Sequence, residues 1–403
     1  MIPRASLDIE WTDLLAATGY SVLPGGEPEV RERLEARWSP AGDAVACLSV
    51  RSGFDLTLQA LALPTGSEVL TSALTIPNMV RLMEWHGLVP VPLDLDPATL
   101  SIEAAAIDRA VTPCTRAVLA APLFGCREPL DAVAEAARRH SLLLLEDCAQ
   151  AYDGSGYRGH PEADVSMFSF GPIKPSTALG GALLRFRDGE LRKRVIALQS
   201  GYPLQSRRAY LARIARFAVL KGLAEPRRFS LFTAACRAAK IDYDRLLREA
   251  VRGFSGPDLV ARLRRRPCAP LLRLLDRRIR SGAHLRIQER ERFTREVRAA
   301  LPEVSFPGSQ AGHRAPWLLP IESDEPDALV HLLRKHGFDA TRGASSLIEV
   351  PAPADRPELH PARAAALLRR LVYLPMYPRM TARDIARLIE LIIGAGLAEG
   401  RRE

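Results

Sequence analysis

Two neighbouring stretches decide the fold: residues 142–150, which read LLLLEDCAQ, and residues 166–181, which read SMFSFGPIKPSTALGG. The four leucines are typical of a strand buried on both faces of a parallel sheet, and that strand ends at Glu146 and Asp147. The second stretch reads as a short aromatic strand that enters a Gly-Pro turn and reaches Lys174. Ligands of such sheets bind beyond the carboxyl ends of the strands, where these polar residues stand.

Around these stretches, apolar runs of strand length alternate with amphipathic segments. The expected strands are Glu68–Ser72, Val89–Leu93, Ala117–Ala121, Leu142–Glu146, Val165–Phe168 and Ala182–Phe186. The expected helices are Phe54–Leu63, Met79–His86, Ile102–Ala110 and Pro129–His140. This alternation predicts an α/β fold, in which a mainly parallel sheet is covered by helices on both faces.

The rest of the chain divides into two further regions. Residues 193–300 look helical and basic, and a strand and helix pattern returns from about residue 315. Its expected elements are Trp317–Ile321, Pro326–His336, Leu371–Leu374 and Thr381–Ile393. We therefore expect a large α/β domain over residues 1–192, a basic helical insertion over 193–270, and a smaller C-terminal α/β domain over 271–403.

Composition and missing motifs exclude several classes of protein. Of the 403 residues 47% are apolar, but no apolar run reaches the roughly 18 residues of a membrane span. The N-terminus carries acidic residues where a secretory signal would be apolar, and the six cysteines form no CxxC pair, so we expect a cytoplasmic protein. The GSGYRG motif at 154–159 precedes a strand pattern and not a helix, which predicts a turn. Asp94 and Asp96 resemble a metal-binding pair, but DLDP reads better as a strand end, and we expect no metal.

Charge is distributed unevenly along the chain. Between Arg192 and Arg298 there are 28 Lys and Arg residues against 9 Asp and Glu, whereas the rest of the chain is net acidic. Three interpretations stay open: a solvated arginine-rich surface, a helix docking on anionic lipid, and a platform for a phosphorylated substrate. The lipid hypothesis rests on Tyr210, Ile214, Phe217 and Leu220, which recur at helical spacing. We expect no nucleic acid, because no recognition motif accompanies the charge.

Three features together point to a pyridoxal phosphate site. Lys174, in a tight and poorly solvated turn, suits covalent bonding to an aldehyde. Asp147 can pair with a pyridine nitrogen, and the helix start in Arg51–Asp55 offers N–H groups to a phosphate. The 27 residues between Asp147 and Lys174 accommodate one strand and its connections, so both groups can reach the same sheet edge.

At this point the sequence resembles a known family, the fold-type I, DegT/StrS-type sugar aminotransferases. The specific signal is EDCAQA followed by SMFSFGPIK. Four weaker matches support it: SGFDLTLQALALPTGSEVL, VPVPLDLDPATL, VTPCTRAVLAAPLFG and LVYLPMYPRMTARDIARLIE. The resemblance implies that Lys174 bonds to the cofactor and moves a proton, while Asp147 pairs with the ring nitrogen. It implies that Gln150 lies by the ring and that Ser169 binds the phosphate. Gly53, Phe54 and Asp55 would stand at the phosphate end and Ile76 against the ring.

Three departures from the family pattern matter. Phe54 stands where threonine is usual, which removes a hydroxyl from the phosphate. Ile76 stands where an aromatic side chain usually stacks on the ring. The GxNxRM segment, through which a neighbouring subunit completes the phosphate site, is not recognisable; residues 200–210 read SGYPLQSRRAY instead.

The resemblance implies an aminotransferase that moves an amino group from glutamate or glutamine to a keto group of a sugar or similar polar metabolite. Relatives with histidine in place of the lysine are dehydratases, so Lys174 favours amino transfer. A homodimer is also implied. Two alternatives stay open: another pyridoxal phosphate reaction on the same fold, such as a lyase or C–C bond-forming step, and a non-catalytic relative that binds a membrane or partner through residues 193–270.

Overall fold

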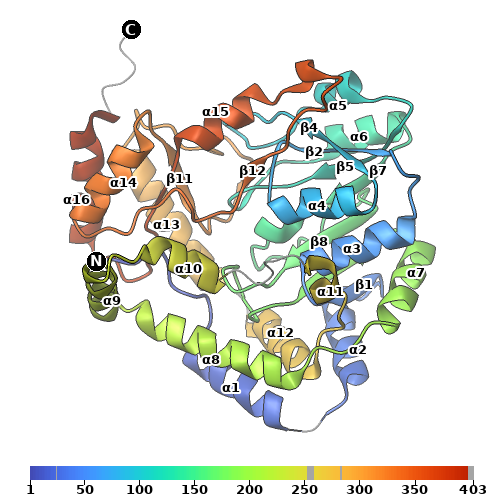
Figure 1. Ribbon diagram of the computed structural model, residues 1–403, viewed down its shortest axis with the longest axis horizontal. Helices are drawn as coiled ribbons and strands as arrows, with labels where there is room; N and C mark the ends of the chain where they lie inside the picture. The colour runs from blue at the N-terminus through green and yellow to red at the C-terminus, as the bar shows by residue number, and fades with distance from the viewer. Residues whose placement is uncertain (24, 252–257, 282–283, 398–403) are drawn as a thin grey trace.

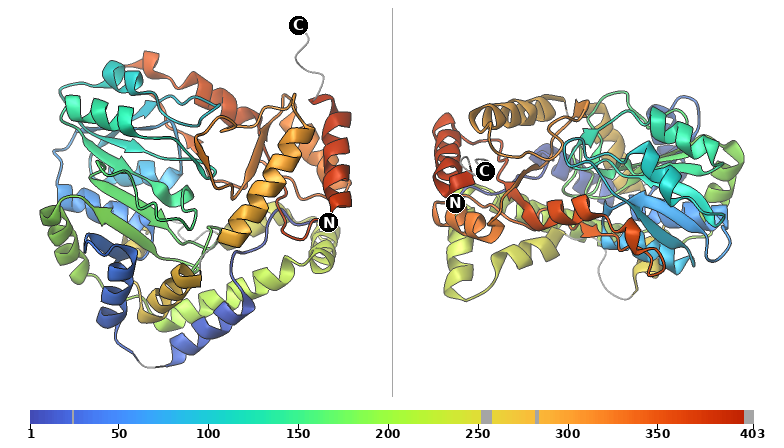
Figure 2. Two further views of the ribbon diagram at one scale, coloured as in Figure 1. Left: turned by 180° about the vertical axis from the view of Figure 1, so that it is seen from behind. Right: turned by 90° about the horizontal axis from the view of Figure 1, so that it is seen from above.

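The structure is a computed structural model that describes residues 1–23, 25–251, 258–281 and 284–397 (Figures 1 and 2). Its centre is a seven-stranded sheet with strand order β1-β9-β8-β7-β5-β2-β4. The strands are β1 (Ala44–Cys47), β2 (Glu68–Ser72), β4 (Val89–Leu93), β5 (Thr115–Ala120), β7 (Leu143–Glu146), β8 (Val165–Ser169) and β9 (Ala182–Phe186). All neighbours pair in parallel except β9, which is antiparallel to both β1 and β8. The prediction of an α/β fold with a mainly parallel sheet is confirmed.

Strand position follows from sequence. The interior strand β7 consists of leucines and ends at the fully buried Glu146. By contrast, β4 contains Pro90 and Pro92, which lack an N–H group, and it lies at the edge of the sheet.

Helices cover both faces of this sheet. One face packs against α3 (Val50–Leu61), α4 (Pro77–Trp85), α7 (Gly189–Ser200) and α11 (Leu259–Leu263). The other face packs against α5 (Ala104–Ala110) and α6 (Asp131–Arg139) near β4, and near β1 against α2 (Glu27–Trp38) and α12 (Ala269–Ser281). The two core layers on opposite sides of the strands explain why both side-chain rows of β5 and β8 are apolar.

The C-terminal part has its own core. It contains the antiparallel pair β11 (Leu319–Glu322) and β13 (Leu371–Leu374), with α13 (His284–Ala300), α14 (Pro326–Lys335) and α16 (Ala382–Ile392) around it. Helix α15 (Ala362–Arg370) and two short pairs, β3 (Leu74–Thr75) with β12 (Ile348–Glu349) and β6 (Cys126–Arg127) with β10 (His313–Arg314), connect this part to the large sheet (Figure 1).

The predicted domain boundaries need two adjustments. Helix α12, with which the predicted 271–403 region opens, packs against α1 (Trp11–Val22), α2 and the large sheet's core. The first residues, in turn, lie with the C-terminal part, because Ile2 N donates to Gly337 O and Arg4 pairs with Asp339. The division into domains otherwise stays a prediction.

The basic segment forms α8 (Arg207–Leu223), α9 (Pro226–Ala238) and α10 (Tyr243–Val251) before α11. Its predicted lipid-facing stripe is not available to a membrane. Tyr210, Ile214 and Phe217 are at most 3% exposed and belong to the core layer around α12, and the Tyr210 hydroxyl donates to Ala178 O. The lipid hypothesis for this stripe was wrong, because apolar residues at helical spacing indicate a buried face but do not show whether protein or lipid covers it. Among the described residues, no helix is long and apolar enough to span a bilayer.

Candidate active site

Asp147 lies where β7 leaves the sheet. Its N–H donates to Ala120 O at the end of β5 (2.8 Å), and its Oδ1 accepts from Ala149 N (3.0 Å), which starts the short helix η1 (Cys148–Gln150). The side chain is buried, and burial raises the pKa of the Asp147 carboxyl above its ordinary value. The Ala149 N–H group and the positive charges of Lys174 and Arg51 oppose this rise.

Lys174 lies in the turn that follows β8, the strand next to β7. Phe170 closes this turn, because its carbonyl accepts from both Ala178 N and Gly180 N (3.1 Å each). Burial lowers the pKa of Lys174 to about 7; the Asp147 charge counteracts the shift and the Arg51 charge adds to it. Lys174 and Asp147 therefore lie close enough for each charge to shift the pKa of the other group.

Trp317 closes the site from the C-terminal part. Its ring centroid lies 4.0 Å from Lys174 Nζ. Trp317 was named from the sequence only as the start of the expected strand Trp317–Ile321, since nothing in a linear pattern reports a contact across 143 positions.

The turn that carries Lys174 is held by a hydrogen bond to Asp8, a residue that sequence reasoning missed. Asp8 Oδ2 accepts from Ser176 N (3.2 Å), two residues beyond Lys174. Asp8 is itself bonded to Arg278 of α12 (3.2 Å) and to Arg286 of α13 (2.8 Å). The N-terminal segment and two helices of the second half of the chain thus position the turn that carries the lysine.

The helix beside the site begins earlier than predicted. Ser49 caps α3 by accepting from Ser52 N (3.2 Å), so the helix starts at Val50 and not at Phe54. In a helix that starts there, the N–H groups of Phe54 and Asp55 lie beyond the first turn. Because Ser52 N donates to Ser49 Oγ, the outward-pointing N–H groups of the first turn are those of Val50 and Arg51. The predicted phosphate contact through Phe54 and Asp55 is corrected accordingly.

The side chains at 53–55 have structural surroundings. A Cβ on Gly53 would lie 2.6 Å from Leu184 of β9, so glycine lets α3 approach the sheet closely. Phe54 is fully buried in the core. Asp55 is also fully buried, and it pairs with Arg264 (2.9 Å) and His86 (2.9 Å), which together with further hydrogen bonds hold the pKa of its carboxyl below its ordinary value against the effect of burial.

Of the remaining predicted residues, two lie at the expected strand ends. Gln150, three residues beyond Asp147, accepts from Phe124 N through Oε1 (3.0 Å). Ser169 ends β8, and its Oγ accepts from Gly171 N (3.4 Å). Ile76 precedes α4 and packs partly against the core layer of α3 and α4. Contact of these three with a cofactor stays a prediction.

Two arginines bring positive charge to the site. Burial and the charge of Arg213 lower the pKa of Arg51 to about 10, while the charge of Asp147 opposes this shift. Arg213 of α8 donates to Leu179 O (3.1 Å). Two residues further on, the N–H group of Gly181 donates to Leu48 O, just before α3. Two guanidinium groups held near one another in a buried site disfavour each other and favour an anion between them. Sequence reasoning recorded Arg213 only as part of the basic segment.

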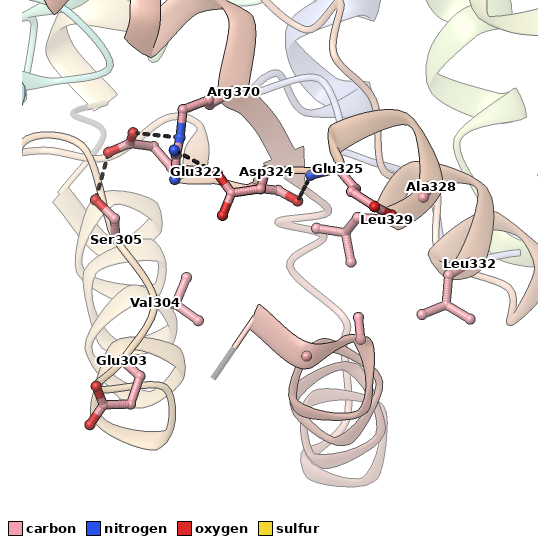
Figure 3. A pocket seen from close by; sticks show the side chains of 13 residues that line it. Glu303, Val304, Ser305, Glu322, Asp324, Glu325, Ala328, Leu329, Leu332 and Arg370 are labelled. Atoms are coloured by element: carbon pink, nitrogen blue, oxygen red, sulfur yellow. Dashed lines mark hydrogen bonds and ion pairs between the residues drawn. The ribbon is translucent and has the colours of Figure 1, made fainter. Parts of the chain in front are cut away.

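Two cavities differ in their relation to this site. One, of about 450 Å³, lies in the C-terminal part between Glu303, Glu322 and Arg370; Arg370 pairs there with Glu322 and Asp324 (Figure 3). None of its lining residues belongs to the Lys174 site, and we assign it no role in the chemistry. A second, of about 310 Å³, is lined by Phe124, Arg298, His313, Arg314, Pro316 and Leu318 among others, and it adjoins the segment that carries Trp317.

Comparison with curated proteins finds relatives that match part of the chain. GDP-perosamine synthase of Caulobacter vibrioides is 31% identical over 182 residues, 44% of this chain and 48% of that protein. A pleiotropic regulatory protein of Geobacillus stearothermophilus is 33% identical over 174 residues, 42% of this chain and 46% of that protein. The chain thus matches these curated relatives over about half of their length.

Solved structures extend the likeness of the fold to the whole chain. The aminotransferase TlmJ of Streptoalloteichus hindustanus superposes with a TM-score of 0.69 at 20% identity, over 99% of both chains. The putative sugar aminotransferase Spr1654 of Streptococcus pneumoniae gives 0.70 at 15% identity, over 99% of this chain and 98% of that one. The sequence model of the DegT/DnrJ/EryC1/StrS aminotransferase family matches residues 22–247, more than half of the chain. The chain therefore belongs to the DegT/DnrJ/EryC1/StrS aminotransferase family.

Proposed function

We propose that this protein is a pyridoxal 5'-phosphate-dependent aminotransferase that moves an amino group from glutamate or glutamine to a keto group of a sugar, nucleotide-linked or free, or of a similar polar metabolite. One observation carries the proposal: a buried acid and a lysine with a lowered pKa, Asp147 and Lys174, meet at the carboxyl ends of β7 and β8. Perturbed pKa values of neighbouring acids and bases are typical of catalytic sites.

The residues of the site fit the three chemical parts of the cofactor. Because the pKa of Lys174 is about 7, a large fraction of its amine is neutral at pH 7 and can bond to an aldehyde. Asp147 offers a buried carboxylate to the pyridine nitrogen, which becomes a cation when it is protonated. Arg51, Arg213 and the first turn of α3 offer positive charge and N–H groups to a phosphate dianion.

Each residue would then have a distinct task. The bound cofactor supplies an electron sink for the bond that breaks at the substrate carbon. Asp147 holds the ring nitrogen in its protonated form, because a buried carboxylate is stabilised by an adjacent cation. Lys174 Nζ, once neutral, takes and returns the proton at the substrate carbon. Trp317 and the lysine turn exclude water from the space around Nζ.

The choice of substrate rests on the family and its members. The family is one of aminotransferases, and one curated relative is named GDP-perosamine synthase, an enzyme of an amino sugar carried on a nucleotide. We propose a keto sugar as the acceptor on this basis, and glutamate or glutamine as the donor. A homodimer in the cytoplasm completes the proposal.

The test uses the full chain reconstituted with pyridoxal 5'-phosphate. A visible absorbance band should appear, and L-glutamate, or L-glutamine, should remove it while one equivalent of the corresponding 2-oxo acid is released. Lys174→Ala should never show the band, whereas Lys193→Ala, on the exposed face of α7, should show it in full.

The alternatives give different results. A band that is stable to glutamate and glutamine but is changed by another amino acid with loss of carbon dioxide would indicate a lyase. A wild-type chain without any band would indicate a non-catalytic relative and would remove the proposal.

A further inference from the structure

Trp317 contains a polar group that the protein itself leaves without a partner. The side chain is 7% exposed, and its Nε1 is fully buried with no hydrogen-bond acceptor among the described residues. Burying a hydrogen-bond donor without an acceptor is unfavourable, because the donor gives up its hydrogen bond to water. Such a group is therefore expected to have an acceptor that the chain does not supply.

The position of the ring indicates where that acceptor comes from. The ring centroid is 4.0 Å from Lys174 Nζ, and Asp147 and Arg51 act electrostatically on the same amine. Trp38 also has an unpartnered Nε1, but its ring lies in the core among Tyr152, Phe168 and Phe170. The unpartnered indole N–H of Trp317 thus belongs to a ring beside the reactive amine, where a ligand is expected to bind.

The backbone just before Trp317 is fixed by contacts with the segment around Gly125. Ala315 N donates to Gly125 O (2.8 Å), and β10, immediately before it, pairs with β6. Gly125 has a φ of +87°, and a Cβ there would lie 2.0 Å from Ala315 O, so only glycine permits this approach. The preceding residue, Phe124, is bonded through its N–H to Gln150 of the site.

The neighbours of Trp317 face a different space. Pro316 and Leu318 line the cavity of about 310 Å³, together with Phe124 and Arg314, whereas Trp317 contacts the lysine. The segment between β10 and β11 therefore borders that cavity through Pro316 and Leu318 and the reactive amine through Trp317.

We propose that Trp317 is a ligand-binding residue of this site: its ring forms the wall over Lys174 Nζ, and its indole N–H donates to an anionic oxygen of the bound ligand. This inference rests on the proposed function. The oxygen can belong to the cofactor or to the carboxylate of the amino acid substrate, and the two sources share the same chemistry toward the indole.

The first experiment tests proximity. Pyridoxal 5'-phosphate is added to the full chain and to two variants, Trp317→Phe and Trp85→Phe, and the loss of tryptophan emission is recorded with the visible band. Trp85 is 65% exposed and serves as the matched control. The emission attributable to Trp317 should be fully quenched, so that the fractional loss becomes smaller in Trp317→Phe than in Trp85→Phe.

The second experiment tests the hydrogen bond. Trp317→Phe keeps a ring against Lys174 but removes the N–H donor, and Trp317→Leu removes both. If the oxygen belongs to the cofactor, Trp317→Phe should weaken pyridoxal 5'-phosphate binding about tenfold. If it belongs to the substrate, cofactor binding should stay unchanged, and the L-glutamate concentration that removes half of the band should rise about tenfold. Trp317→Leu should be affected at least as strongly.

The outcomes separate this inference from the proposed function. A wild-type band with equal quenching in both phenylalanine variants, or with unchanged cofactor and glutamate affinities in Trp317→Phe, overturns the role of Trp317 and leaves the aminotransferase proposal intact. A wild-type chain that never forms the band removes both.

Discussion

Asp55 and Asp147 are both buried carboxylates beside the same sheet, yet their surroundings differ. Asp55 is bonded directly to Arg264, His86 and Gln59, and His86 and Arg264 lower the pKa of its carboxyl. Asp147 accepts one backbone N–H and has cations nearby, and burial raises its pKa. A buried carboxylate that is fully paired with cations and donors stays ionised and has no reason to bind a ligand. A buried carboxylate that is only partly paired can still bind a cationic or donor group of a ligand.

The same contrast separates two regions of the molecule. The arginines of α12 and α13 pair with acids near the N-terminus, which we call the N-terminal clasp: Asp8, Asp13, Arg277, Arg278 and Arg286. Its Asp13–Arg278 pair is buried, with an N–O distance of 2.6 Å. The arginines of this clasp account for part of the positive charge seen in the sequence. At the site around Lys174, burial is the largest influence on the pKa of both Asp147 and Lys174, and it is the region where chemistry is expected.

The largest effect should follow from Asp147→Asn. The amide has nearly the same shape but no charge for the ring nitrogen, so turnover should fall by about 10²–10³-fold. Steady-state transamination with glutamate measures this, and circular dichroism should show an unchanged fold. Full activity of the variant would contradict the role given to Asp147.

Asp55→Asn should have the opposite profile. Loss of the charge leaves Arg264 and His86 without their partner, at a cost of about 2 kcal/mol in the free energy of unfolding. Denaturant unfolding measures the loss, and pyridoxal 5'-phosphate affinity should not change. Asp108→Asn, on an exposed ion pair with Arg139, is the control and should leave the unfolding midpoint where it is. A large loss of cofactor affinity in Asp55→Asn would contradict the purely structural role given to its carboxylate.

Arg213 lies on the basic segment but belongs electrostatically to the site, so it sharpens the comparison. Arg213→Gln should weaken binding of pyridoxal 5'-phosphate about tenfold, because a charged donor to the phosphate is lost. Binding of pyridoxal, which has no phosphate, should be unaffected. Arg216→Gln, exposed on the same helix, should change neither affinity. Equal weakening for both forms of the cofactor would show that Arg213 acts on the fold and not on the phosphate.

The smallest effect concerns pH. Because the pKa of Lys174 is about 7, its neutral fraction rises about tenfold between pH 6 and pH 8 and then levels off. The rate at which the cofactor-free protein captures pyridoxal 5'-phosphate should follow this curve. A lysine with its ordinary pKa near 10.4 would give a rise of about a hundredfold over the same range without a plateau; such a result would mean that Lys174 is solvated.

Sequence reasoning was strongest where the relevant information is local. The strands Glu68–Ser72, Val89–Leu93 and Ala182–Phe186 have the predicted bounds, because apolar runs and their turn residues are adjacent in the chain. Asp147 directly follows β7 and Lys174 lies in the turn after β8, and the sequence predicts them as a pair because parallel neighbours bring such residues to one edge. The start of α3 was misplaced because Ser-Gly at 52–53 reads as a loop, whereas packing on Leu184 is what requires the glycine.

Contacts between distant segments could not be predicted in the same way. Arg213, Trp317 and Asp8 reach the lysine turn from three separate parts of the chain. A single sequence contains the helical period of α8 but no record of what its apolar face meets. A lipid contact of Tyr210 therefore stayed open as one of three hypotheses, although its hydroxyl is bonded to Ala178 of the lysine turn.

The bond between Asp8 and Ser176 N has a practical consequence for protein engineering. The same short N-terminal stretch is bonded at Ile2 and Arg4 to the C-terminal part and at Asp8 to the turn that carries the reactive amine. A shortened version that starts at Glu10 would keep the sheet and its helices but lose these tethers. Affinity tags and truncations are therefore better introduced elsewhere, and a colourless shortened protein would say little about the chemistry of the intact one.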